Sequence, residues 1–291
     1  MKNYVHYGFS VQLVISPYPF FPKGVFMSRN PALTFVLTLA ASITLALTPT
    51  AHAQAPDWAK IRIGVEANYP PFSQMGTDGK FSGFDIDIAN ALCAQMKAEC
   101  TLVSQEWDGM MPALNARKFD MIVASMTISE ERLKVADFSD SYYDIPSTFV
   151  AKTGAFQDIG AAALKGKTII VTRNTPRAKY LAENYKDSQI LQVAKEADVT
   201  MELAAGRGDI GFGSSLAATV AFLKSAEGKA FSKVGPPINP SGNKAGGTGI
   251  AMRKGETTLR NKVNAALKAI TGNGVYKSIN DKYFDVNIRG E

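Results

Sequence analysis

Short apolar runs alternate with helical patterns from residue 61 to the end of the chain, and no other feature limits the possible fold as strongly. This alternation is typical of βαβ units stacked on a mainly parallel sheet. After Pro146 the pattern starts again at Ser147, so we expect two similar α/β halves. No low-complexity linker separates them, and two extended crossovers, near residues 144–148 and 243–249, are expected to join them.

The apolar periodicity places the individual elements. We expect strands at residues 61–65, 101–103, 119–124, 147–151, 168–172, 210–212 and 250–252. We expect helices at residues 86–96, 107–116, 177–185, 199–205, 216–223 and 258–271, with a further helix begun at Ser129 and helical turns after residue 271. Thr175 followed by Pro176 is a typical helix start, with a capping hydroxyl and then proline at the first helical position.

The first 53 residues follow the order of a secretory signal peptide. Arg29 supplies positive charge, residues 32–47 form an apolar run, and Ala51-His52-Ala53 fits a cleavage site. An uncleaved membrane anchor is the alternative, but the run is shorter than the ~20 residues of a spanning helix. We therefore predict export to the periplasm and cleavage after Ala53. Residues 1–26 fit neither a signal peptide nor a folded element, so Met27 is the predicted true start.

Composition excludes several function classes for the chain beyond this leader. The protein has 291 residues, and both of its histidines, His6 and His52, lie in the leader. A histidine general base, a Ser/His/Asp triad and a His-ligated metal are therefore excluded. The remaining 238 residues carry 29 basic and 26 acidic side chains in an interspersed order. A net charge of +3 is too weak to indicate nucleic-acid binding.

The two cysteines suit an oxidising compartment. Cys93 falls late in a predicted helix, and Cys100 follows seven residues later at the next predicted strand. One local disulfide is feasible, and two buried free thiols are the alternative. The predicted export favours the disulfide.

The run GFDIDIANALC at residues 83–93 resembles the signature of bacterial extracellular solute-binding proteins, family 3, which bind polar amino acids for ABC transporters. The resemblance extends over nearly all of residues 61–290 and is strongest to members that bind lysine, arginine, ornithine or histidine, whose disulfide has the same spacing. It implies an α/β, two-lobed periplasmic binding protein fold of type II, with two Rossmann-like lobes joined by two hinge strands. Lobe 1 would comprise residues 54–145 and 246–291, and lobe 2 residues 146–245.

The resemblance also assigns roles to residues of lobe 1. Arg132 would hold the ligand's α-carboxylate with its planar guanidinium. From the residues alone, an exposed helix arginine paired with a neighbouring glutamate is the favoured interpretation of Arg132, and the resemblance reverses that preference. Ser125 and Thr127 would complete the hydrogen bonds of the carboxylate. Ala124 stands where several family members carry serine and would offer only its backbone.

Three further residues of lobe 1 match positions that surround the ligand's side chain in the family. Tyr69 and Trp107 would sandwich its aliphatic part, although an aromatic after a first strand, such as Tyr69, is more often a core residue. Glu66 stands where the binders of cationic amino acids have an aspartate that meets the distal ammonium or guanidinium. Asp85 and Asp87 suit the start of a helix and are not assigned to the ligand.

Lobe 2 departs from the family pattern. Thr172 and Thr175 are expected to line the cleft, but Pro176 replaces a threonine and removes one N–H donor. Ser214 falls where relatives place the aspartate that pairs with the α-ammonium, and a serine supplies no charge. Arg177, and beside it Arg173, could serve a second carboxylate, although such arginines are usually just solvated.

These observations predict the periplasmic substrate-binding component of an ABC transporter for a polar or cationic amino acid or a derivative. The alternatives are a receptor for an opine-like or dicarboxylate ligand, or a periplasmic dehydratase on the same fold. A dehydratase would need a catalytic acid or base, for which only Glu66 is a candidate. We therefore expect no catalytic residues, cofactor or metal, no nucleic-acid partner, a monomer, and an inner-membrane ABC permease as the partner.

Overall fold

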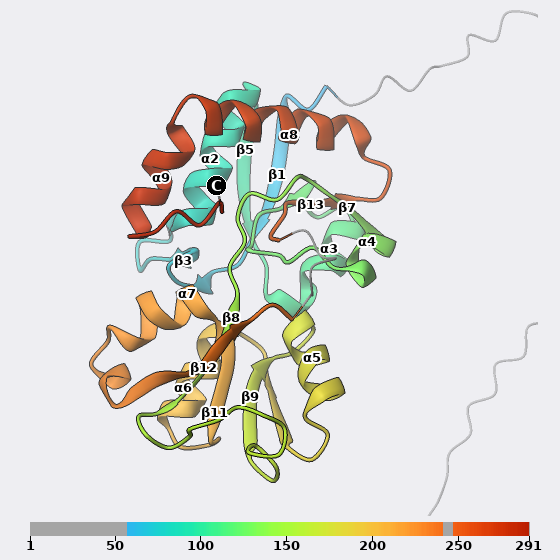
Figure 1. The fold of residues 1–291 in the computed structure, drawn as a ribbon. Helices are drawn as coiled ribbons and strands as arrows, with labels where there is room; N and C mark the ends of the chain where they lie inside the picture. Colours follow the sequence, from blue (N-terminus) through green and yellow to red (C-terminus); the bar gives the residue numbers. More distant parts are fainter. Residues whose placement is uncertain (1–56, 241–246, 291) are drawn as a thin grey trace, which may run out of the picture. The chain divides into compact units, whose positions relative to one another are not determined.

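A computed structural model describes residues 57–240 and 247–290. The predicted leader and part of the second predicted crossover lie outside these residues. Within them the chain forms two mixed five-stranded sheets, each covered by helices, with helices α2 and α8 beside the first and α5 and α6 beside the second (Figure 1). No helix in these two ranges is both long enough and apolar enough to span a membrane.

The first sheet has the strand order β5-β1-β6-β13-β7. Its strands are β1 (Lys60–Val65), β5 (Glu99–Ser104), β6 (Met121–Ile122), β7 (Ala136–Phe138) and β13 (Ala251–Arg253). Helices α2 (Phe84–Met96), α8 (Thr257–Gly272) and α9 (Val275–Tyr283) share one apolar core with β1. Helix α3 (Met110–Asn115) shares a second core with β6 and β7. Helix α4 (Glu130–Val135) leads into β7.

The second sheet has the strand order β10-β9-β11-β8-β12. Its strands are β8 (Ser147–Lys152), β9 (Thr168–Thr172), β10 (Gln189–Val193), β11 (Ile210–Ser214) and β12 (Phe231–Ile238). Helix α5 (Pro176–Asn184) packs on one core of this sheet. Helix α6 (Glu196–Ala204) and the segment after α7 (Ser215–Ala217), a π-helical stretch over Ala218–Leu223, pack on the other.

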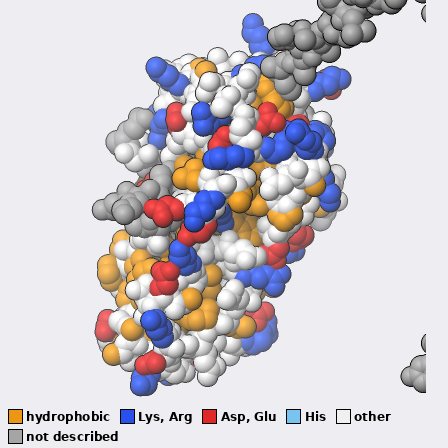
Figure 2. Space-filling model, turned by 90° about the vertical axis from the view of Figure 1, so that its right-hand side faces the viewer, with side chains coloured by type: hydrophobic (Ala, Val, Ile, Leu, Met, Phe, Trp, Pro, Cys, Tyr) orange, Lys and Arg blue, Asp and Glu red, His pale blue; other side chains and the backbone are white. Residues whose placement is uncertain are grey.

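Smaller elements complete the chain. Strands β2 (Asn68–Tyr69), β3 (Ser73–Met75) and β4 (Phe81–Ser82) form a small antiparallel sheet between β1 and α2. Two 3₁₀ turns, η1 (Trp107–Gly109) and η3 (Glu227–Ala230), precede α3 and β12. Figure 2 shows Lys and Arg side chains interspersed with Asp and Glu over the face that it presents.

The prediction of two mainly parallel sheets was wrong for half of the strand pairs. In the first sheet β5, β1 and β6 are parallel, but β13 pairs antiparallel with both β6 and β7. In the second, β10, β9 and β11 are parallel, whereas β8 pairs antiparallel with β11 and β12. The chain passes from the first sheet to the second between β7 and β8 and returns between β12 and β13. All four of these strands lie in the antiparallel half of their sheet.

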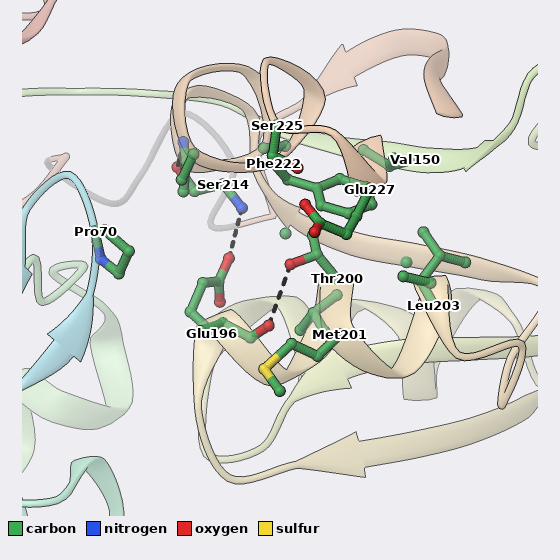
Figure 3. A pocket seen from close by; sticks show the side chains of 18 of the residues that line it. Pro70, Val150, Glu196, Thr200, Met201, Leu203, Ser214, Phe222, Ser225 and Glu227 are labelled. Atoms are coloured by element: carbon green, nitrogen blue, oxygen red, sulfur yellow. Dashed lines mark hydrogen bonds between the residues drawn. The ribbon is translucent and has the colours of Figure 1, made fainter. Parts of the chain in front are cut away.

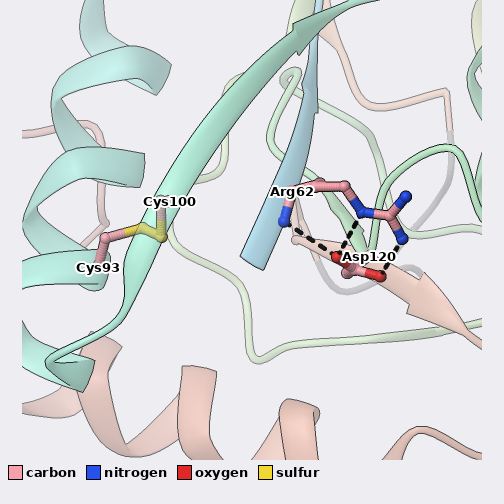
Figure 4. The surroundings of a disulfide bond; sticks show 4 residues. All are labelled: Arg62, Cys93, Cys100 and Asp120. Atoms are coloured by element: carbon pink, nitrogen blue, oxygen red, sulfur yellow. Dashed lines mark hydrogen bonds and ion pairs between the residues drawn. A yellow bond between two sulfur atoms is a disulfide. The ribbon is translucent and has the colours of Figure 1, made fainter. Parts of the chain in front are cut away.

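The disulfide between Cys93 and Cys100 is present, as predicted, and joins the last turns of α2 to β5 (Figure 4). In the same view Arg62 of β1 donates from Nη2 to Asp120 Oδ1 over 2.9 Å, which ties β1 to the residue before β6. The Arg62–Asp120 contact holds β1, the strand that Glu66 follows, and the disulfide anchors β5, which pairs with β1.

We expect the double variant Cys93→Ser, Cys100→Ser to lose about 2.5 kcal/mol of unfolding free energy, because the disulfide removes loop-closure entropy from the unfolded chain. Urea denaturation of the variant and the oxidised protein measures the difference. A loss below about 0.5 kcal/mol would contradict this account of the disulfide.

Candidate functional site

Nine of the eleven predicted ligand residues line one cavity between the two sheets. They are Glu66, Tyr69, Trp107, Ser125, Thr127, Arg132, Thr172, Thr175 and Arg177. Pro176 and Glu196 also line it. The cavity has a volume of about 30 Å³, roughly the room of one or two waters. A larger solute can therefore enter only when the surrounding side chains or the two halves move apart.

Arg132 brings a half-buried positive charge to this cavity. It lies in the first turn of α4, whose N-cap Ser129 accepts from the Arg132 backbone N–H over 3.3 Å. Its Nη1 donates to Thr127 O over 2.7 Å and its Nη2 to Asn174 O over 3.0 Å, and the guanidinium lies 5.1 Å from the Trp107 ring centroid. Burial, and then the charge of Arg177, lower the pKa of Arg132 to about 10.

The Arg132 guanidinium has no acidic partner among the described residues, where no ion pair within 4.0 Å involves it. A cation that is partly removed from water without a counter-ion loses hydration, and an anion beside it offsets that loss. Its planar set of donors fits a carboxylate. This end of the cavity can therefore hold an anionic group.

Glu66 brings an unpaired acid to the same cavity. It follows β1 directly and is only 4% exposed, and its Oε1 has no hydrogen-bond partner within the described part of the chain. Burial raises the pKa of Glu66 to about 8, and the charges of Glu196 and Glu106 add to this effect. A cationic group beside Glu66 would offset its desolvation and favour the charged carboxylate.

Glu196 is a cavity residue that the sequence analysis missed. It is the first residue of α6 and lies buried against the end of β11. Its Oε1 accepts from Ser214 N over 2.7 Å, and its Oε2 accepts from Thr172 Oγ1 over 2.6 Å and from Arg177 Nη2 over 2.5 Å. A carboxylate has about four acceptor positions, so one remains for a further donor.

Glycine at position 213 makes room for this carboxylate. A Cβ there would lie 2.7 Å from Glu196 Oε1, which is closer than real contacts allow. The sequence places an uncharged serine at 214, yet the structure supplies an acid to the same strand end from the neighbouring helix. The signal that could have identified Glu196 is weak, because an acid at a helix start is ordinary.

Arg177 is paired rather than free. Burial, the largest single effect, would lower the pKa of Arg177, but the charge and hydrogen bond of Glu196 together with Tyr69 and Tyr143 outweigh it, and the pKa is raised. Its Nε is buried without an acceptor in the described residues. Arg173, the other arginine considered for a carboxylate, pairs with Asp108 instead.

Ala124 and Ser214 do not line the cavity. Ala124 is buried in the core of the first half. Ser214 caps α7, where its Oγ accepts from Ala217 N over 3.4 Å, and it lines a separate groove described below. Thr175 caps α5, and its Oγ1 accepts from Ala178 N over 3.2 Å.

Ser125 is fixed by a buried acid outside the cavity. Its Oγ donates to Asp85 Oδ2 over 2.7 Å, and Tyr142 OH donates to Asp85 Oδ1 over 2.7 Å. Burial raises the pKa of Asp85 to about 7, although these two hydrogen bonds oppose the shift. Ser125 has a positive φ of 52°, so this network holds an unusual backbone conformation at the cavity wall.

Polar contacts close the rim between the two halves. Asp108 Oδ1 accepts from Asn174 Nδ2 over 2.7 Å, and Asp108 pairs with Arg173. Trp107 Nε1 donates to the Arg173 carbonyl oxygen over 3.2 Å. Such exposed contacts contribute little stability each, so they suit a rim that opens and closes.

The comparisons with known proteins agree with this geometry. The family model for bacterial extracellular solute-binding proteins, family 3, matches residues 61–286. The L-arginine-binding protein of Pseudomonas aeruginosa is 41% identical over 253 residues, which cover 86% of this chain and 96% of that protein. The lysine/arginine/ornithine-binding periplasmic protein of Escherichia coli K12 is 32% identical over 88% of this chain and 98% of that protein.

Solved structures are similar to the chain as well. An ancestral arginine-binding protein bound to arginine matches with a TM-score of 0.71 and 31% identity, over 78% of this chain and 98% of that one. An ancestral amino acid-binding precursor of cyclohexadienyl dehydratase matches with a TM-score of 0.69 and 30% identity, over 78% and 96%. The resemblance and the two-lobed type II fold predicted from the sequence are confirmed. The chain belongs to the bacterial extracellular solute-binding proteins of family 3.

Proposed function

We propose that this protein binds a cationic amino acid of the arginine, lysine and ornithine class between its lobes and releases it unaltered to an ABC permease. One observation carries the proposal: a half-buried guanidinium without an acidic partner among the described residues, Arg132, and a buried carboxylate with an unpaired oxygen, Glu66, line the same cavity. A ligand with a carboxylate at one end and a cation at the other neutralises both.

The remaining polar groups suit the rest of such a ligand. The free acceptor position of Glu196 suits the α-ammonium, which Ser214 alone could not neutralise. Tyr69 and Trp107 offer flat apolar surfaces for the methylene groups. The names of the relatives specify arginine, lysine, ornithine and histidine, which supports the same class of ligand.

Isothermal titration with three matched solutes tests the proposal. L-arginine is expected to bind, and a concentration of 100 times its Kd would add about 2.7 kcal/mol to the unfolding free energy. Citrulline has the shape of arginine without the distal charge, and agmatine lacks the carboxylate. Both are expected to bind at least 100-fold more weakly. Equal affinity for arginine and citrulline, or for arginine and agmatine, would contradict the roles of Glu66 or Arg132.

We expect arginine binding to depend on pH because of Glu66. Burial and the charges of Glu196, Glu106 and Asp85 raise the pKa of Glu66 to about 8, and the charge of Lys195 acts in the opposite direction. The unliganded carboxyl is therefore mostly protonated at pH 7. A cationic ligand requires the charged form, so binding releases a proton. Affinity should rise about tenfold per pH unit from pH 6 and level off above pH 8.

Calorimetry at several pH values, in buffers with different ionisation enthalpies, measures this proton release. Glu66→Gln is the control, because any dependence that remains in it belongs to other groups such as Asp85. Arginine affinity that does not change between pH 6 and pH 8 in the unsubstituted protein would contradict the prediction.

One observation favours a second candidate, an opine-like ligand with two carboxylates. The Nε of Arg177 is buried without an acceptor within the described residues and could bind a second carboxylate. Octopine therefore belongs in the same titration series. The second candidate requires octopine to bind more tightly than arginine.

The wider role follows from the family. We propose lobes of residues 54–145 with 246–291, and of 146–245, with the ligand closing the hinge between them. The permease would recognise the closed form through a shift of population. Export with cleavage after Ala53, and the monomeric state, stay predictions. The curated relatives named here are binding proteins, and Glu66 alone would have to serve a dehydratase as acid or base, so binding is the better-supported function.

A further inference from the structure

A second, apolar groove lies beside the ligand cavity and shares Tyr69 and Glu196 with it. It runs between α6 and the stretch from α7 to the π-helical turns, on the second sheet, and has a volume of about 300 Å³. Figure 3 looks into it: Pro70 lies at the end next to Glu196 and Ser214, and Leu203 and Val150 lie toward the other end.

Small side chains create this groove. β11 contributes Gly211 and Gly213, and the following turns contribute Ala217, Ala218 and Ala221. Val150, Val199, Leu203 and Phe222 form an apolar wall. The one threonine that lines the groove in the described part of the chain is Thr200, whose hydroxyl donates to the Ala197 carbonyl oxygen over 3.1 Å. Its proton therefore needs no acceptor on an occupant. The only charged side chains among the described residues of the lining are those of Glu196 and the exposed Glu227.

Both halves of the protein contribute to the inner end. Tyr69 and Pro70 belong to the β2 region beside the first sheet, and Glu196 and Ser214 belong to the second. An occupant at this end would be held by both halves, as a ligand in the neighbouring cavity is. An apolar cavity of ~150 Å³ can take up a benzene-sized group, and this groove is larger.

We propose that the groove receives an apolar substituent carried on the amino group of the ligand. This inference rests on the proposed function, in which Glu196 meets the ligand's amine and Glu66 meets the distal cation. The amine is then the part of the ligand nearest to the groove. An uncharged Ser214 and the small residues of β11 leave space beside it, and the apolar lining excludes a charged substituent. Arg177 lines the cavity but not the groove.

Isothermal titration with L-arginine and Nα-butyl-L-arginine tests the inference. The protein is expected to bind the butyl compound at least as tightly as arginine. Two variants fill the groove: Ala218→Leu at its buried part and Ala221→Leu at its exposed part. Each should lower the affinity for butyl-arginine at least tenfold and change the affinity for arginine less than twofold. Ala226→Leu, exposed and outside the lining, is the matched control and should alter neither affinity.

Each contrary result has a separate meaning. If the unsubstituted protein binds butyl-arginine more than tenfold more weakly than arginine, the inference is overturned and the proposed function stands. If the filling variants leave both affinities unchanged or reduce both equally, the groove belongs to another occupant, such as a partner protein, and the inference is overturned. If neither compound binds, the proposed function fails and the inference fails with it. Should Ala218→Leu not fold, the exposed Ala221→Leu decides the outcome.

Discussion

Replacing Arg132 with alanine is expected to weaken arginine binding at least 100-fold. Loss of one partner of a buried charge pair costs about 2–5 kcal/mol, and 1.4 kcal/mol corresponds to a factor of ten. In the unliganded protein Arg132 lacks an acidic partner within the described residues, so most of the effect should appear in binding rather than in folding. Titration calorimetry measures the affinity.

Two further variants separate charge from geometry. Arg132→Lys keeps the charge but loses the planar donor pair, so we expect an intermediate loss of about tenfold. Arg260→Ala on α8 removes an arginine outside the cavity and should bind arginine normally. Arginine affinity that is unchanged in Arg132→Ala would remove Arg132 from the site.

Glu66→Ala is expected to abolish the binding of cationic ligands at concentrations that saturate the unsubstituted protein. The carboxylate has no hydrogen-bond partner for Oε1 in the described part of the chain, so a cationic ligand is its natural counter-ion. Citrulline, which lacks that charge, should bind the variant with nearly the affinity that it has for the unsubstituted protein. Calorimetry with both ligands therefore gives a change in specificity rather than a general loss.

A matched acid at the rim serves as the control for Glu66. Glu106 pairs with Lys195 over 3.1 Å and is exposed, so Glu106→Ala should change arginine affinity by only a few-fold. An unchanged arginine affinity in Glu66→Ala, measured beside this control, would retire the assignment of Glu66.

The sequence was sufficient to predict the elements with strong local signals. The capped start of α5 at Thr175 and Pro176 and the disulfide lie where they were predicted. β12 was missed because Pro236 and Pro237 argue against a strand, but it is an edge strand with an irregular register between Val234 and Ile238, where prolines are tolerated.

The pairing of β13 between β6 and β7 could not be read locally. It joins residues more than 110 positions apart, and no nearby pattern specifies such a contact. The candidate site shows the same difference between residues with a local sequence signal and residues without one. Motif positions predicted Arg132 and Glu66, which line the cavity. Glu196 was missed because the N-cap of α6, Lys195, gives no side-chain cap, and the apolar periodicity became visible only at Val199.

A crystal structure of the protein with L-arginine tests the central claim most directly. The account predicts both lobes closed on the ligand, its carboxylate on the Arg132 guanidinium, its own guanidinium on Glu66 and its amine beside Glu196. A complex in which Arg132 points to bulk solvent, or in which arginine has been converted to another compound, would contradict the account.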